Sequence, residues 1–419
     1  MPAARSFQPD LIDRRNISDF LALRRNTVLL LVALVLAGTG ERLWLGFASK
    51  YLETLGAGVL VIGVFDALQT LLGAVYAWPG GWLTDKWGQR RSLLLFNALS
   101  LAGYLVVLSW QHWLALVIGA FLFLAWSALS LPATFAVVAT SLDRRQHTMG
   151  VGVQSMVRRV PMMLGPLAGG WLITRYGWAQ GVRYALHGCI ALSAATAVFQ
   201  WLMTEPAKDA AGEPVKPGAS FLGVVKSFNP TLRELLVSDI LIRFCERLPY
   251  AFVILWAMNH GGVSAREYGW LVAIEMVTAM VCYIPVAHLA DKHGQRPFVL
   301  ATFVFFTLFP LTLIWAHNFA WLAVAFVVRG LKEFGEPARK ALIIAQAAPE
   351  LRARTYGAYY LIRDCAVTSG SFLGAWLWSI SPQANFLGAA LLGAAGAVWF
   401  WRFVYRSSRF QLSSEAHSP

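Results

Sequence analysis

The chain has 419 residues, of which 57% are hydrophobic and only 14% are charged. Soluble domains are about 45–50% apolar and about 25% charged, so the composition excludes an ordinary soluble protein. The formal net charge of +13 raises the question of a nucleic-acid partner, but the 35 Lys and Arg residues are not gathered into one basic arm or helix. The cysteines lie far apart in apolar stretches without a CxxC pair, so we expect neither a disulfide framework nor a metal site.

Apolar segments of about 20 residues, the length that crosses a bilayer core as a helix, recur along the chain. We place them at 28–49, 57–80, 92–110, 113–139, 149–174, 180–203, 235–259, 267–289, 298–316, 319–345, 355–379 and 384–405. The first span follows several arginines, as the core of a secretory signal does. A second hydrophobic helix comes directly after it, so we expect no cleavage. The sequence therefore predicts an all-α membrane protein with twelve transmembrane helices.

One long polar segment, 204–234, is rich in Pro, Gly and charged residues, which cannot form an apolar span. It divides the predicted helices into two sets of six. The predicted organisation is a cytoplasmic N-terminal segment 1–27, a six-helix bundle 28–203, a cytoplasmic central loop 204–234, a second bundle 235–405 and a cytoplasmic tail 406–419. With both termini inside, the basic residues predicted on the outer side are only Lys50, Arg175, Arg183 and Arg266. This positive-inside distribution explains the net charge without nucleic acid.

The two halves repeat each other. Residues 205 positions apart are often identical: Glu41-Arg42-Leu43 with Glu246-Arg247-Leu248, Arg158 with Arg363, and Trp171-Leu172 with Trp376-Leu377. At an offset of 206, a polar loop repeats as well: Asp85, Lys86, Gly88, Gln89 and Arg90 with Asp291, Lys292, Gly294, Gln295 and Arg296. Parallel repeats related by an axis along the membrane normal place a solute site at their interface, near the midplane.

The repeated loop carries a family resemblance. Gly81, Leu83, Asp85, Gly88 and Arg90 match G-x-L-x-D-x-x-G-x-R, the signature between the second and third helices of the major facilitator superfamily. The chain resembles this family over almost its whole length. The resemblance implies two pseudo-symmetric six-helix bundles. It also implies a cytoplasmic latch that holds the halves together when the site faces outward, formed by Gly81, Asp85, Gly88, Arg90, Asp291, Gly294 and Arg296. The second copy departs from the signature at Ala287, and a merely positive-inside loop is the alternative.

The fifth span contains a second resemblance. Gly165, Pro166, Gly169 and Gly170 are similar to the end of the family's antiporter motif, G-x-x-x-G-P-x-x-G-G, with Pro161 in place of its first glycine. The motif implies a hinge or packing site and favours export, although small residues also permit an ordinary tight helix contact. The family's arginine motif in the fourth helix is not recognisable.

Charged residues inside the predicted spans are functional candidates, since a charge at the centre of a membrane helix costs about 2.5–3.5 kcal/mol on insertion scales. The symmetric candidates are Glu41 and Arg42, Glu246 and Arg247, and Arg158 and Arg363. Guanidinium groups bind carboxylate and phosphate in a bidentate manner, so the arginines could form a cationic cavity for an organic anion. Alternatively, they are structural, with Arg42 paired to Glu246 and Arg247 paired to Glu41.

Carboxyl groups in a medium of low dielectric retain protons more readily than in water, which suits proton coupling. The candidates are, in order, Glu41, Glu246, Asp66 and Glu275. In the tenth span, spacings of four residues predict self-paired charges, with Arg329 beside Glu333 and with Lys332, Glu336 and Lys340 in one stripe.

Nucleotide-binding, zinc-protease and hydrolase motifs are absent from the sequence, so we expect neither an enzyme nor a cofactor. The first hypothesis is a monomeric secondary transporter in a bacterial-type inner membrane that exports a small organic solute by alternating access and proton antiport. Its expected partners are the solute, H⁺ and the lipid bilayer, although sodium remains an alternative coupling ion. The other hypotheses are a transporter of an organic anion and a receptor that binds without transport.

Overall fold

The computed structural model describes residues 25–130, 157–204, 221–346 and 352–405. The N-terminal half contains α2 (Arg25–Leu45), α3 (Ala48–Thr54), α4 (Val59–Trp87), α5 (Gln89–Ser109), α6 (Trp113–Phe123) and α9 (Arg159–Trp201). The element α9 is two helices joined at Gly177, whose φ of 78° is open to glycine at little steric cost. The predicted break between the fifth and sixth spans, 174–180, contains this residue.

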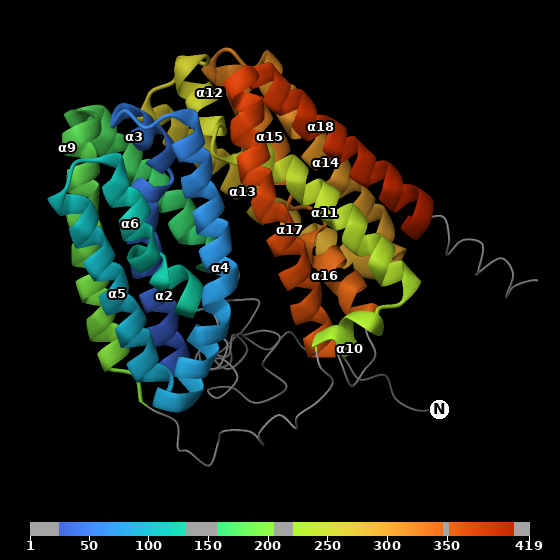
Figure 1. The fold of residues 1–419 in the computed structure, drawn as a ribbon, viewed down its shortest axis with the longest axis horizontal. Coiled ribbons are helices and arrows are strands. Elements are labelled where there is room, and N and C mark those ends of the chain that lie inside the picture. The colour runs from blue at the N-terminus through green and yellow to red at the C-terminus, as the bar shows by residue number, and fades with distance from the viewer. Residues whose placement is uncertain (1–24, 131–156, 205–220, 347–351, 406–419) are drawn as a thin grey trace, which may run out of the picture.

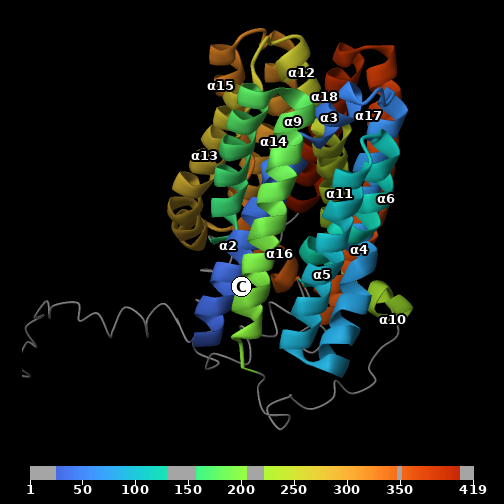
Figure 2. The same cartoon turned by 90° about the vertical axis from the view of Figure 1, so that its left-hand side faces the viewer.

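The C-terminal half contains α10 (Phe221–Lys226), α11 (Pro230–Tyr250), α12 (Val253–Asn259), α13 (Ala265–His293), α14 (Arg296–Trp315), α15 (Phe319–Leu331), α16 (Glu336–Ala345), α17 (Arg352–Ile380), α18 (Pro382–Trp399) and η4 (Phe400–Tyr405). The two halves form two bundles that lean together where α3 and α12 lie (Figure 1). We call this the α3/α12 end and the opposite one the α10 end; Figure 2 shows the same two ends from the side.

The structure has the fold class that the sequence predicts, an all-α membrane protein of the two-bundle type. Seven helices among the described residues are long and apolar enough to cross a membrane. Many large apolar side chains are exposed, including Leu60, Val281 and Leu391. Such side chains can contact lipid tails favourably, whereas a soluble protein rarely exposes so large an apolar surface.

The tenth span differs from its prediction as one continuous helix over 319–345. It is interrupted between α15 and α16, where the N–H of Gly335 donates a 2.6 Å hydrogen bond to Thr302 Oγ1 of α14. Lys332 and Glu333, which lie in the interruption, form ion pairs with other elements. Contacts between elements thus stabilise a break that helix propensity does not predict. The domain boundaries remain predictions, and the predicted central loop 204–234 contains α10 and the start of α11.

Candidate functional site

A cavity of about 320 Å³ lies between the two halves. Its wall comes from α2, α3, α4 and α9 on one side and from α11, α12, α13 and α15 on the other. Of the predicted candidates, it is lined by Arg42, Asp66, Glu246 and Glu275. Apolar and aromatic side chains, among them Tyr250, Tyr268 and Ile254, complete the wall. A cavity that combines apolar and aromatic side chains with several convergent charged groups can hold a small molecule.

Asp66 of α4 forms an ion pair that joins the two halves. Its Oδ1 lies 2.9 Å from Arg247 Nη2 of α11, and its Oδ2 accepts a 2.6 Å hydrogen bond from Ser371 Oγ of α17. Arg247 Nε donates a 3.0 Å hydrogen bond to the same serine oxygen. Asp66, Arg247 and Ser371, which we call the cross-half triad, thus connect three helices through polar side chains.

Glu246 has its ion pairs within its own half. Its carboxylate lies 2.6 Å from Arg243 Nη1 and 2.5 Å from Lys332 Nζ. Glu275 likewise pairs with Arg329 at 3.2 Å, and the guanidinium of Arg329 lies over the ring of Phe326. The predicted pairs between Arg42 and Glu246, and between Arg247 and Glu41, are therefore wrong. The predicted pair of Arg329 with Glu333 is also wrong, since Glu333 pairs with Arg159 of the other half at 3.4 Å. The predicted pairing of Lys340 with Glu336 is confirmed, at 3.4 Å.

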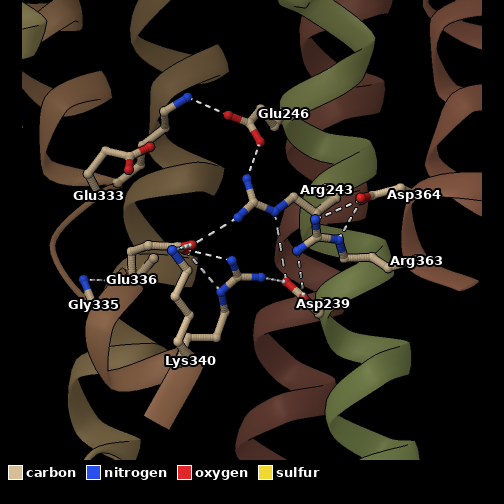
Figure 3. Close-up of polar contacts among 12 residues, drawn as sticks. Asp239, Arg243, Glu246, Glu333, Gly335, Glu336, Lys340, Arg363 and Asp364 are labelled. Atoms are coloured by element: carbon tan, nitrogen blue, oxygen red, sulfur yellow. Dashed lines mark hydrogen bonds and ion pairs between the residues drawn. The ribbon is translucent and has the colours of Figure 1, made fainter. Parts of the chain in front are cut away.

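A buried ion-pair network continues from Glu246 towards the α10 end (Figure 3). Arg243 bridges Glu246 and Glu336, which lies 3.4 Å away. Arg339 pairs with Asp239 and, at 2.6 Å, with Glu336. Arg363, one of the predicted site residues, lies 3.5 Å from Asp239 and 2.7 Å from Asp364. Opposite charges within one half satisfy each other here, which is the pattern of a structural network.

Asp239 and Arg243 were missed as site residues, although both are charged and lie inside the predicted seventh span, which was the available signal. Ser371 carries no such signal. Its position in the repeat corresponds to Pro166, which has no hydroxyl group.

Glu41, Arg42 and Arg158 meet in a smaller cavity of about 70 Å³ within the N-terminal half. Its wall also includes Ser127, Ser130 and Met162. Glu41 is buried in this cavity wall. Arg42 and Met162 line both this cavity and the larger one, so the two spaces adjoin.

The glycines of the fifth span lie at close helix contacts. A Cβ atom on Gly165 or Gly169 would collide with the backbone of Arg42 or Leu43 in α2. A Cβ atom on Gly170 would collide with the backbone of Ala265 in the other half, and one on Gly269 would collide with the backbone of Pro166. Gly63 of α4 is the repeat equivalent of Gly269, and it packs closely against Ser371 and Ala375 of α17. The halves thus touch along two seams, α9 against α13 and α4 against α17.

The residues of the predicted latch lie at the α10 end. Gly88 and Gly294 occupy equivalent turns, with φ values of 87° and 83°. Arg90 lies over the ring of Trp201, 4.5 Å from its centroid, and Arg296 begins α14. The backbone of Gly81, Asp85 and Asp291 is helical, but the side chains of the two aspartates lie outside the described residues, so the latch stays a prediction. In the described part of the chain, no three His, Cys, Asp or Glu side chains form a metal-binding group.

Comparison with known proteins decides the family. The family model described as Major Facilitator Superfamily matches residues 30–261 and 235–418. The chain belongs to this superfamily. It is therefore a multi-pass membrane transporter, and the resemblance predicted from the loop motif is confirmed.

Among relatives of this superfamily, multidrug resistance protein MdtG of Dickeya zeae is 25% identical over 416 residues, covering 94% of this chain and 98% of the relative. MdtG of Escherichia coli O1:K1 / APEC is 23% identical over 410 residues, covering 93% and 97%. The nucleoside transporter NupG has a similar fold, with a TM-score of 0.75 at 12% identity over 90% of this chain and 99% of that one. At this identity, the structural likeness shows the fold alone.

Proposed function

We propose that this transporter exports a small organic solute across a bacterial-type inner membrane, by alternating access and in exchange for protons. The observation that supports this most is the pairing of a shared central cavity with a carboxylate, Asp66, whose ion pair crosses the two halves. The relatives described as multidrug resistance proteins support export and a range of organic substrates.

The halves are joined at the α3/α12 end, which is the outer end in the predicted topology. Asn259 at the end of α12 donates a 3.0 Å hydrogen bond to Glu53 of α3, and Lys50 bonds to both residues. The N–H of Arg266 donates a 2.9 Å bond to Thr174. In this proposal, the structure is the state closed to the outside, in which the cavity takes up solute from the cytoplasm.

Asp66 is the proposed carrier of the exchanged proton. Glu41, Glu246 and Glu275 have their basic neighbours in their own half, so their charge bears less directly on how the halves meet. An ionised Asp66 attracts Arg247 and stabilises the closed outer end, whereas a protonated Asp66 loses this attraction. An antiporter needs this behaviour, because a carrier that holds neither proton nor solute must not reorient.

Transport into sealed proteoliposomes tests the proposal. Vesicles that contain the purified protein are given a pH gradient and a panel of organic anions and lipophilic cations, with solute flux and internal pH recorded together. We expect solute movement against its gradient and a coupled proton flow, both lost in Asp66→Asn. The control Glu234→Gln removes a carboxylate that bonds Trp399 within one half, so it should transport normally.

Solute flux without proton movement would refute antiport. Binding without flux in the wild-type protein would instead favour a receptor.

A further inference from the structure

The basic side chains of the central region differ between the two halves. Those of the C-terminal half have carboxylate partners within 4 Å: Arg243 and Lys332 with Glu246, Arg329 with Glu275, Arg339 with Asp239, and Arg363 with Asp364. Arg247 is paired across the halves. Within residues 25–130, 157–204, 221–346 and 352–405, by contrast, Arg42 and Arg158 have no ion-pair partner at that distance and donate no hydrogen bond.

Arg42 and Arg158 line the small N-terminal cavity together, with Glu41 as the carboxylate that acts on both. Among the described residues that line this cavity, one carboxylate faces two guanidinium groups, which leaves an excess positive charge. Such a charge is costly inside a membrane protein unless a counter-charge is present. The hydroxyl groups of Ser127 and Ser130 donate to backbone carbonyls, so the guanidinium N–H groups are the strong donors available in the cavity.

We infer that Arg42 and Arg158 bind the anionic group of the transported solute, a carboxylate or a phosphate-type group. This subsite rests on the proposed transport function and specifies the class of substrate. Guanidinium groups recognise both anions through paired N–H donors. The rest of the solute extends past Arg42 and Met162 into the larger cavity, whose wall includes Ile254 and Tyr268. The sequence also predicted Arg247 and Arg363 as members of an anion site. They are not part of this subsite, because each already forms an ion pair with a carboxylate.

Glu41 sets the affinity of this subsite, because its negative charge repels the incoming anion and attracts the same arginines. Removing that charge must therefore strengthen anion binding.

Binding to the purified protein in detergent tests the subsite without requiring transport. The probes share one apolar body and differ in the head group: 3-phenylpropionate, 3-phenylpropylphosphonate, 3-phenylpropionamide and 3-phenylpropylammonium. Calorimetry should show both anions binding at least about tenfold more tightly than the neutral amide. Arg42→Gln and Arg158→Gln should each remove most of this preference, and Arg158→Lys should restore part of it. Glu41→Gln should tighten anion binding severalfold, a gain that misfolding cannot produce.

The charge-matched control is Lys340→Gln, which removes a half-exposed cation that pairs with Glu336 in the C-terminal half and should leave anion binding unchanged. Equal binding of the acid and the amide, tighter binding of the ammonium probe, or an unchanged preference in both arginine variants would overturn the inference. Anion binding without proton-coupled flux would refute the proposed antiport but leave the subsite intact. Proton-coupled flux of cations but not of anions would support the proposed antiport and refute the anion subsite.

Discussion

Asp239 and Arg339 form a buried pair between α11 and α16, and the side chain of Arg339 is 2% exposed. Asp239→Asn would leave this guanidinium beside Glu336 alone and weaken the contact with Arg363. Because removing one partner leaves the other charge buried, we expect the folded state to lose about 3 kcal/mol or more. Thermal unfolding in detergent measures the loss. Lys340→Gln, at a side chain 44% exposed, should cost no more than about 1 kcal/mol. Equal melting temperatures in the two variants would show that the network is not structural.

Sequence alone identifies which residues carry unusual charge but not which partners they have. Glu41 and Arg42 stand out because they lie inside an apolar span and recur as Glu246 and Arg247. Adjacent residues point about 100° apart on a helix, however, and the sequence does not say which of them faces the other half. The predicted pairs of Arg42 and Arg247 were wrong for this reason. Arg247 finds Asp66, a residue with no counterpart in the repeat.

Two glycines illustrate the difference between a close helix contact within one half and an open helix surface. Gly169 of α9 lies against the backbone of Leu43 in α2, so Gly169→Ala forces these two helices apart. Overpacking of this kind costs about 1–3 kcal/mol, and we expect a lower melting temperature. Among the described residues, no other helix comes within 4 Å of the place that a methyl group on Gly73 of α4 would take, so Gly73→Ala should be neutral or slightly stabilising. Unfolding curves of the two variants provide the comparison, and equal stability would mean that α2 and α9 can move apart freely.

Helices were the most predictable level of the structure. Runs of apolar residues gave the spans, and glycines with positive φ at 88, 177 and 294 end them. The break between α15 and α16 was not predicted, because Lys332 and Gly335 are held by Glu246 and Thr302, which are remote in sequence. The charged residues inside α11 and on α15 and α16 likewise form ion pairs with other helices, so their surroundings could not be predicted from the local sequence.

The relative position of the two halves could not be derived from the sequence, since a transporter of this kind must adopt at least two arrangements. The repeat predicts an interface between halves but not which end is closed. Two seams close the α3/α12 end here, and they differ in chemistry. The α4/α17 seam carries Asp66 and Ser371, whereas the equivalent positions in the α9/α13 seam are Val272 and Pro166. One seam thus contains a titratable ion pair beside its close packing, while the other is formed by close packing.

The α9/α13 seam gives a prediction for the whole molecule. Gly269 lies against the backbone of Pro166 across the two halves, so a methyl group in Gly269→Ala disfavours the closed α3/α12 end without disturbing either bundle. Spin labels at Thr54→Cys and His260→Cys, in a background that lacks Cys282 and Cys365, report the separation of this end. We expect the population with a long distance to grow at least tenfold, while the melting temperature changes little. Gly73→Ala should leave the distance distribution as in the wild-type protein. An unchanged distribution in Gly269→Ala would mean that this seam does not control the closure.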